Sequence, residues 1–320
     1  MAFAFAVESW APEYGAPMEP ENAPDRPPPE VDISVELEPG DWRPLTPLSA
    51  TAAHVAFVDG VQRVDARIWI TNADGSANQG ICASYAAGVV RCNGNARVED
   101  SRPGRVVCAP GVLEGIQLPG AWGSYAPAAP KGRTVRHLVD ALEARRRDLE
   151  VELSNNAAPA DLVVLDGSLY GRQHVANAIG YLKSHEVAYL AGAEAAVIGQ
   201  LECGQRTPVF LTNDNWSRYS WYLRLPCARE HPWAGVVRCE SGHGFGVREA
   251  IRLADLSAAT LPQYASDPHK DPRAPQNLYP IAGLERELRR HLGDQLLLYR
   301  ALRLASTSPP RANGEQPAGD

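Results

Sequence analysis

The sequence of 320 residues contains no long apolar run and no basic leading segment. A membrane-spanning helix needs roughly 18 uninterrupted apolar residues, so we expect no span and no membrane partner. The apolar first ten residues lack the basic start of a secretory signal, which favours a cytoplasmic protein. The hydrophobic fraction of 44% is large enough for a substantial core. These features predict a soluble globular protein.

The six cysteines are scattered along the chain, without the Cys-x-x-Cys spacing that is typical of zinc and redox sites. A free cysteine usually packs as a small hydrophobic side chain. We therefore expect buried free thiols and no zinc or disulfide framework.

Basic residues are not in excess, and the formal net charge is −7. Phosphate binding depends on lysine and arginine, so the surface as a whole is not suited to coating nucleic acid. Arginines concentrate in residues 133–147 and 286–303, but interleaved acids make a solvated helix face the simpler interpretation of each stretch. Any contact with DNA must therefore be local.

Proline and acidic residues dominate residues 11–48, a composition that favours extended backbone. We expect an N-terminal arm over residues 1–48, one catalytic domain over residues 49–305 and a disordered polar tail over residues 306–320. No internal repeat of fixed period is present.

Within residues 49–305 the apolar residues follow strand-like and helix-like periods in turn, which predicts a mixed α/β fold. The expected strands are 55–58, 67–70, 88–92, 106–108, 162–165, 208–211, 220–225 and 235–239. The expected helices are 134–153, 174–184, 186–200 and 284–304, with an irregular segment at 267–280. The continuous apolar run at 162–165 is typical of a strand buried on both faces of a sheet.

Two apolar runs end in the same pair of residues, Asp59-Gly60 after residues 55–58 and Asp166-Gly167 after residues 162–165. An aspartate at the end of a buried strand stands on a rigid support at the edge where α/β sheets bind ligands. Each pair alone is also a common turn. Two converging carboxylates would repel each other, and a divalent cation such as Mg²⁺ or Mn²⁺ would relieve that repulsion. Their recurrence favours a site over two unrelated turns.

Further motifs follow in a fixed order along the chain, and with the two Asp-Gly pairs the sequence resembles the NurA family of DNA-end-processing nucleases. The resemblance covers about residues 50–300. The matching segments are Asp59-Gly60, Arg145-Arg146-Arg147-Asp148-Leu149-Glu150, Leu165-Asp166-Gly167-Ser168-Leu169, Gly180-Tyr181-Leu182-Lys183-Ser184, Trp221-Tyr222-Leu223-Arg224-Leu225 and Leu278-Tyr279-Pro280.

The resemblance implies a ribonuclease H-like core with a mixed central sheet and flanking helices, preceded by the extended arm. It also implies a nuclease that depends on Mn²⁺ or Mg²⁺ and acts on DNA in end resection and double-strand break repair. The implied activity is that of a 5′–3′ exonuclease with single-strand endonuclease activity. The implied assembly is a homodimer that works with a HerA-type hexameric translocase.

Carried over to this chain, the resemblance makes Asp59, Glu150 and Asp166 the catalytic, metal-binding acids. Glu143 and Glu152 are near Glu150 on the predicted helix and are alternatives to it.

Three residues of the later motifs are given supporting roles by the resemblance. Lys183 is assigned to the scissile phosphate or to water, although a surface lysine is an equal alternative. Arg224 and Tyr279 are expected to contact nucleic acid.

One position departs from the family pattern. The family places a histidine eight residues after the tyrosine of its Tyr-Pro motif, and here that position is Glu287. Glu287 is therefore our candidate for the fourth metal ligand. Glu285 and His291 lie on the same predicted helix and are alternatives. The departure also supports a rival hypothesis, a non-catalytic DNA-binding or translocase-adaptor subunit that keeps the nuclease fold.

Overall fold

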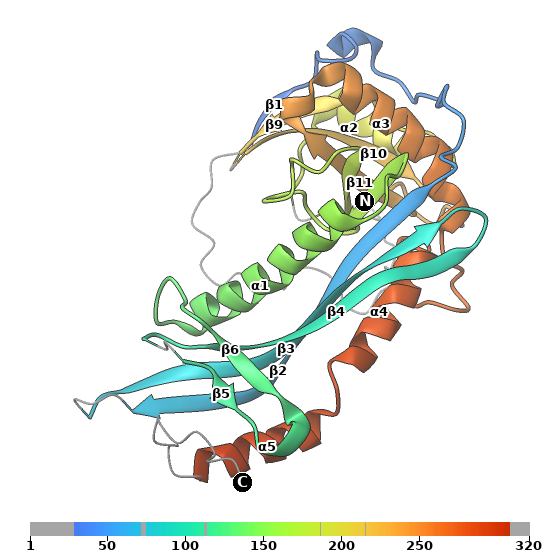
Figure 1. The fold of residues 1–320 in the computed structure, drawn as a ribbon. Helices are drawn as coiled ribbons and strands as arrows, with labels where there is room; N and C mark the ends of the chain where they lie inside the picture. Colours follow the sequence, from blue (N-terminus) through green and yellow to red (C-terminus); the bar gives the residue numbers. More distant parts are fainter. Residues whose placement is uncertain (1–28, 72–74, 112–113, 186, 215, 308–320) are drawn as a thin grey trace. The chain divides into compact units, whose positions relative to one another are not determined.

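A computed structural model describes residues 29–307, except residues 72–74, 112–113, 186 and 215. The described chain forms two compact units. The first contains the described residues up to Asp59, Gly88–Asp100 and Glu150–Arg286, and the second contains Gly60–Ala87, Ser101–Leu149 and the residues from Glu287 onward. Strands and helices occur together in both units (Figure 1), so the predicted mixed α/β class is confirmed.

Several long elements contribute residues to both units, because the chain passes from one unit to the other within them. They are β2 Val55–Thr71, β3 Ala77–Cys92, β4 Ala96–Cys108, α1 Val135–Asn156 and α4 Tyr279–His291. The structure confirms the helix predicted at 134–153 as α1.

The first unit is built on a sheet with the strand order β1-β9-β10-β11-β8-β7-β2. Pairing is antiparallel from β1 to β8 and parallel between β8 and β7 and between β7 and β2. The remaining elements of this unit are β1 Glu30–Asp32, β7 Leu162–Asp166, β8 Ala178–Leu182, α2 Gly192–Gln200, β9 Phe210–Asn213, β10 Ser217–Arg224, β11 Val236–Gly242 and α3 Val247–Thr260, with short 3-10 helices at Pro39–Asp41, His243–Phe245 and Leu261–Tyr264.

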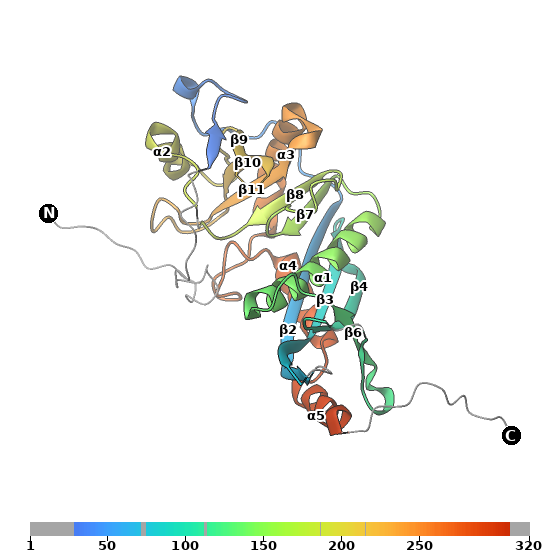
Figure 2. The same cartoon turned by 90° about the vertical axis from the view of Figure 1, so that its left-hand side faces the viewer.

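Helices pack on both faces of this sheet. Ile198 of α2 packs with Phe210 and Tyr222 in one core cluster. Side chains alternate between the two faces along a strand, so Trp221 points to the other face, where its indole N–H donates to Ser257 of α3 at 3.1 Å. Helix α3 contacts β10 and β11 and lies beside them in Figure 2. Residues 162–165 of β7 are buried, as predicted for a central strand.

The second unit contains the neighbouring strands β2-β3-β4-β6-β5, with β5 at Ile116–Gln117 and β6 at Ser124–Ala128, a 3-10 helix at Gly120–Trp122 and helix α5 at Gln295–Thr307. Leu138 and Leu142 of α1 pack on one core cluster, and Leu298 and Leu302 of α5 on another. All six cysteines are free thiols. Cys82, Cys92, Cys108 and Cys239 are buried, as predicted, whereas Cys203 is exposed and Cys227 is half-buried. No helix that the structure describes has the length and apolar character needed to cross a bilayer.

Several predicted elements are wrong in type or extent. Residues 174–184 contain the strand β8 and no helix, because tertiary pairing with β7 decides the conformation of this apolar segment. The helix predicted at 186–200 begins only at Gly192. The helix predicted at 284–304 is two helices, which separate near Gly293, where φ is +76°. Gly60 does not turn the chain, because β2 continues through it to Thr71. Helix α3 was not predicted.

Part of the predicted arm is integrated into the first unit. Strand β1 pairs with β9, and the Trp42 ring packs against Phe210 with their centroids 6.3 Å apart. Glu36 accepts hydrogen bonds from both terminal nitrogens of the buried Arg206 at 2.8 Å. Residues 29–48 are thus part of the folded unit. The predictions for residues 1–28 and 308–320 lie outside the described residues.

Candidate active site

Asp59 and Asp166 lie side by side in the first unit, because β2 and β7 pair in parallel. The register aligns Val58 with Leu165, so the next residue on each strand is the aspartate. Asp166 ends β7, and Gly167 turns the chain with φ of +85°. Asp59 is only 8% exposed and lies inside the longer strand β2. The predicted convergence of the two Asp-Gly pairs is therefore present, although only the second pair forms a turn.

Lys183 follows β8 and bonds directly to the end of β7. Its ammonium nitrogen lies 2.7 Å from Asp166 Oδ2 and 3.1 Å from Asn277 Oδ1. Asn277 is fully buried, and its amide donates to Asp271 Oδ2 at 2.6 Å. The lysine is thus held by a fixed polar chain, which a surface lysine would not have.

Glu150 of α1 is buried and paired with Arg172. The distance from Arg172 Nη1 to Glu150 Oε2 is 2.5 Å, and both side chains are at most 5% exposed. Arg172 Nη2 also donates to the carbonyl oxygens of Asp166, at 3.2 Å, and of Ser168. One arginine therefore joins the helix acid to the turn that follows β7. Glu152, one of the alternatives, is exposed.

Negative charge is crowded around Asp59. Burial and, after it, the nearby carboxylates of Asp166, Glu150 and Glu285 raise the pKa of Asp59 to about 8, although the cation of Lys183 acts in the opposite direction. Glu285 forms an ion pair with Arg273, which belongs to the same unit. These four acids therefore share one electrostatic environment, and in the absence of a bound cation Asp59 tends to hold a proton.

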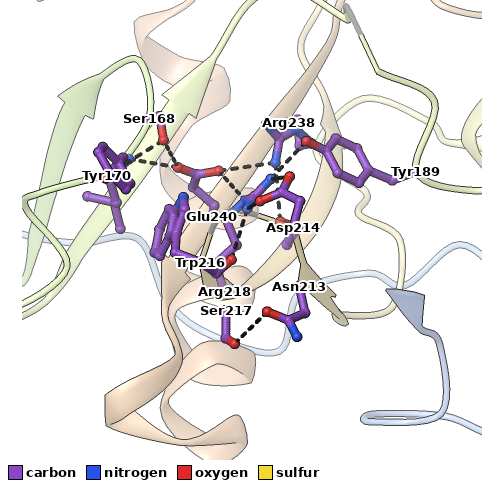
Figure 3. Close-up of polar contacts among 12 residues, drawn as sticks. Ser168, Tyr170, Tyr189, Asn213, Asp214, Trp216, Ser217, Arg218, Arg238 and Glu240 are labelled. Atoms are coloured by element: carbon purple, nitrogen blue, oxygen red, sulfur yellow. Dashed lines mark hydrogen bonds and ion pairs between the residues drawn. The ribbon is translucent and has the colours of Figure 1, made fainter. Parts of the chain in front are cut away.

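A second buried acid supports the turn after Asp166 (Figure 3). Glu240 of β11 is fully buried, and its Oε1 accepts hydrogen bonds at 2.7 Å from the Ser168 hydroxyl and from the Leu169 amide. Its Oε2 lies 3.1 Å from nitrogens of both Arg218 and Arg238. Neither Glu240 nor Arg172 was predicted, because the residues that they contact are distant in sequence or lie in an irregular turn.

The remaining predicted site residues lie apart from this cluster or in other roles. The expectation that Arg224 contacts DNA does not fit its placement, because it is 1% exposed and its guanidinium donates to backbone carbonyls that include that of Ile198. Tyr279 is 36% exposed, and its hydroxyl donates to Asp267 at 2.5 Å. Glu287 belongs to the second unit, where it pairs with Arg290 at 3.0 Å and His291 at 3.4 Å.

Among the residues that the structure describes, no group of three or more His, Cys, Asp or Glu side chains has the spacing of a formed metal site. Two acids of the cluster instead contact cationic side chains, Asp166 at the end of β7 through Lys183 and Glu150 of α1 through Arg172. The cluster therefore supplies carboxylate donors that are at present neutralised by the protein's own cations.

Comparison with known proteins gives a match to a family model and similarity to solved structures. The family model described as NurA domain matches residues 130–290, just over half of the chain. No curated protein matches the chain by sequence. Among solved structures, the NurA nuclease from Sulfolobus solfataricus is similar with a TM-score of 0.46 and 11% identity, over 84% of this chain and 89% of that chain. The family match includes Glu150, Asp166 and Lys183, whereas Asp59 precedes it.

Proposed function

The chain belongs to the NurA domain family, and we propose that it is a metal-dependent nuclease that hydrolyses phosphodiester bonds in DNA. The observation that carries the proposal is the parallel pairing of β2 with β7, which sets Asp59 beside Asp166. Glu150 and Glu285 act electrostatically on the same aspartate. A cluster of acids on rigid strands and helices is the arrangement that metal-dependent phosphodiester hydrolysis requires.

We propose Asp59, Glu150 and Asp166 as the residues that would hold Mn²⁺ or Mg²⁺. Carboxylate oxygens are the donors that these hard cations prefer, and the raised pKa of Asp59 marks negative charge that a cation would relieve. When bound, the metal would polarise the phosphate and lower the pKa of a water nucleophile. For the fourth metal ligand we favour Glu285 over Glu287. Glu285 belongs to the same unit as Asp59, and its charge raises the pKa of Asp59.

The cations of the cluster have separate roles in this proposal. Lys183 is aimed by Asp166 and Asn277 and would bind a non-bridging oxygen of the scissile phosphate. Arg172 is buried and would keep Glu150 and the turn after β7 in place, with no contact to DNA. Positioning of the acids and binding of the phosphate thus belong to different side chains.

The wider reaction follows the family resemblance. We propose a ribonuclease H-like core that cuts as a 5′–3′ exonuclease and as a single-strand endonuclease in DNA end resection and double-strand break repair. The proposed assembly is a homodimer with a HerA-type translocase in the cytoplasm.

A non-catalytic DNA-binding or translocase-adaptor subunit is the second candidate. The observation that favours it is that Lys183 and Arg172 already occupy oxygens of Asp166 and Glu150. In that case the acids would only stabilise the folded structure, and their substitution would leave binding to DNA or to the translocase unchanged.

Digestion of end-labelled DNA with Mn²⁺, Mg²⁺ or EDTA separates the two candidates. Asp59→Asn and Asp166→Asn should each abolish metal-dependent cleavage and keep the circular dichroism spectrum of the parent. Asp161→Asn is the matched control, because Asp161 is an exposed aspartate that directly precedes β7, at the end opposite Asp166. The nuclease proposal would be contradicted if either site variant cleaved DNA like the parent. It would also be contradicted if the parent, tested together with the translocase, cleaved DNA with neither Mn²⁺ nor Mg²⁺.

A further inference from the structure

Two aromatic side chains from distant segments meet beside the turn that follows β7. Tyr170 is four residues after Asp166, and its side chain is 52% exposed. Its ring centroid lies 6.4 Å from that of Trp216, with an angle of 60° between the planes. Trp216 is half-buried and precedes β10. Both residues belong to the first unit, with the acid cluster.

Hydrogen bonds and ion pairs around the buried Glu240 connect both residues to the turn that follows β7. Glu240 holds the turn through Ser168 and Leu169, and the Tyr170 amide donates to the Ser168 hydroxyl at 3.2 Å. On its other oxygen Glu240 pairs with Arg218, whose guanidinium lies 5.2 Å from the centroid of the Trp216 ring and donates to the Trp216 carbonyl.

Figure 3 shows the two aromatic side chains on one side of Glu240, with Arg238 and Tyr189 on the other. Arg218 is itself fixed by both oxygens of Asp214, at 2.7 and 2.9 Å. The buried Arg218 therefore fixes Trp216, and the backbone amide of Tyr170 fixes that residue to the turn, while the Tyr170 side chain remains exposed.

We propose that Tyr170 and Trp216 form a stacking platform for a base of single-stranded DNA next to the cleavage site. This proposal rests on the proposed nuclease function. An aromatic ring can stack on any base, so such a platform suits a nuclease that cuts without regard to sequence. Tyr and Trp give a large contact area at a low entropy cost, and the Arg218 cation strengthens the Trp216 face. Because Tyr170 is four residues after Asp166, the Cα atoms of the two residues are at most about 14 Å apart, so one DNA strand can contact both.

The test compares binding of two strands to the full-length protein in EDTA, where metal-dependent cleavage cannot occur. One strand is a fluorescein-labelled oligothymidylate, and the other is an abasic strand of equal length, which keeps the phosphates and lacks the bases. Fluorescence anisotropy gives the affinities. Tyr170→Ala and Trp216→Ala should each weaken binding of oligothymidylate about tenfold, the usual loss for one stacked base, and leave binding of the abasic strand unchanged.

Tyr170→Phe and Trp216→Phe are the conservative controls, because each keeps a ring and should restore most of the affinity. Trp69→Ala controls for the loss of any exposed tryptophan, since Trp69 is 72% exposed in the second unit. Equal affinities of the parent and both alanine variants for oligothymidylate would overturn the platform, and so would a parent that binds both strands equally. The nuclease function is judged separately by cleavage of duplex DNA, so its failure is distinguishable from that of the platform.

Discussion

Replacing Asp59 with asparagine should stabilise the metal-free protein. Burial and nearby acids raise the pKa of this carboxyl from 3.8 to about 8 in the fold. Because the folded-state pKa lies above the unfolded value, the contribution of Asp59 to the free energy of unfolding is highest below pH 3.8 and falls as the pH rises towards 8. At about 1.36 kcal/mol per pKa unit, the whole shift sets a ceiling of about 6 kcal/mol. Water and neighbouring side chains rearrange around the charge, so we expect Asp59→Asn to recover about 2–3 kcal/mol near pH 8.

Thermal unfolding in EDTA, monitored by circular dichroism from about pH 5 to pH 8, measures this effect. The Tm of Asp59→Asn should exceed that of the parent by roughly 5 °C at the upper pH, and the difference should shrink as the pH falls. Asp161→Asn should follow the pH dependence of the parent. Added Mn²⁺ should stabilise the parent more than Asp59→Asn, because only the parent keeps all the proposed ligands. A variant that is less stable than the parent at about pH 8, or a Tm difference that grows towards acid pH, would refute this reasoning.

Three further predictions follow from individual contacts. Glu36→Gln removes a charged partner of the buried Arg206 and should cost about 2 kcal/mol in urea unfolding; an unchanged midpoint would show that the contact contributes nothing. In Gly180→Ala, the added methyl carbon would lie 2.9 Å from a carbonyl oxygen in the turn after β7, which should cost about 1–3 kcal/mol and slow cleavage; parent-like Tm and rate would contradict it. Glu285→Gln should raise the Mn²⁺ concentration needed for cleavage, whereas Glu287→Gln should leave it unchanged and cost at most about 0.5 kcal/mol, since its arginine partner is exposed. If instead Glu287→Gln raised the required Mn²⁺ concentration and Glu285→Gln did not, Glu287 would be the fourth metal ligand.

The sequence was most informative where local pattern and tertiary environment agree. The apolar run at 162–165 predicts a buried central strand ended by Asp166-Gly167, and β7 has these properties, with Gly167 in a conformation that favours glycine. The same pattern at Asp59-Gly60 misleads. There β2 continues through Gly60, beyond its last pair with β7 at Val58, and β3 is its hydrogen-bonded neighbour on the other side.

Contacts between residues that are distant in the sequence could not be predicted from local sequence patterns. The partners of Glu240 at the turn are about seventy residues away, and the segment 236–242 has the pattern of any buried strand. Arg172 lies in an irregular stretch whose closure on α1 depends on the fold. Residues 174–184 were predicted as a helix although they form β8, because the pairing with β7 outweighs local preference. Local patterns therefore located Asp166, but not the charged groups that hold its turn in place.

The dependence of DNA cleavage rate on Mn²⁺ concentration tests the central claim, that the clustered acids hold the metal that cleavage requires. Glu150→Gln and Glu152→Gln are a matched pair, because both acids lie on α1, one buried in the cluster and the other exposed. For Glu150→Gln we expect half-maximal cleavage at a Mn²⁺ concentration that is about 10- to 100-fold higher, or no cleavage, and for Glu152→Gln the curve of the parent. Identical curves for the parent and both variants would place the metal elsewhere and contradict the account.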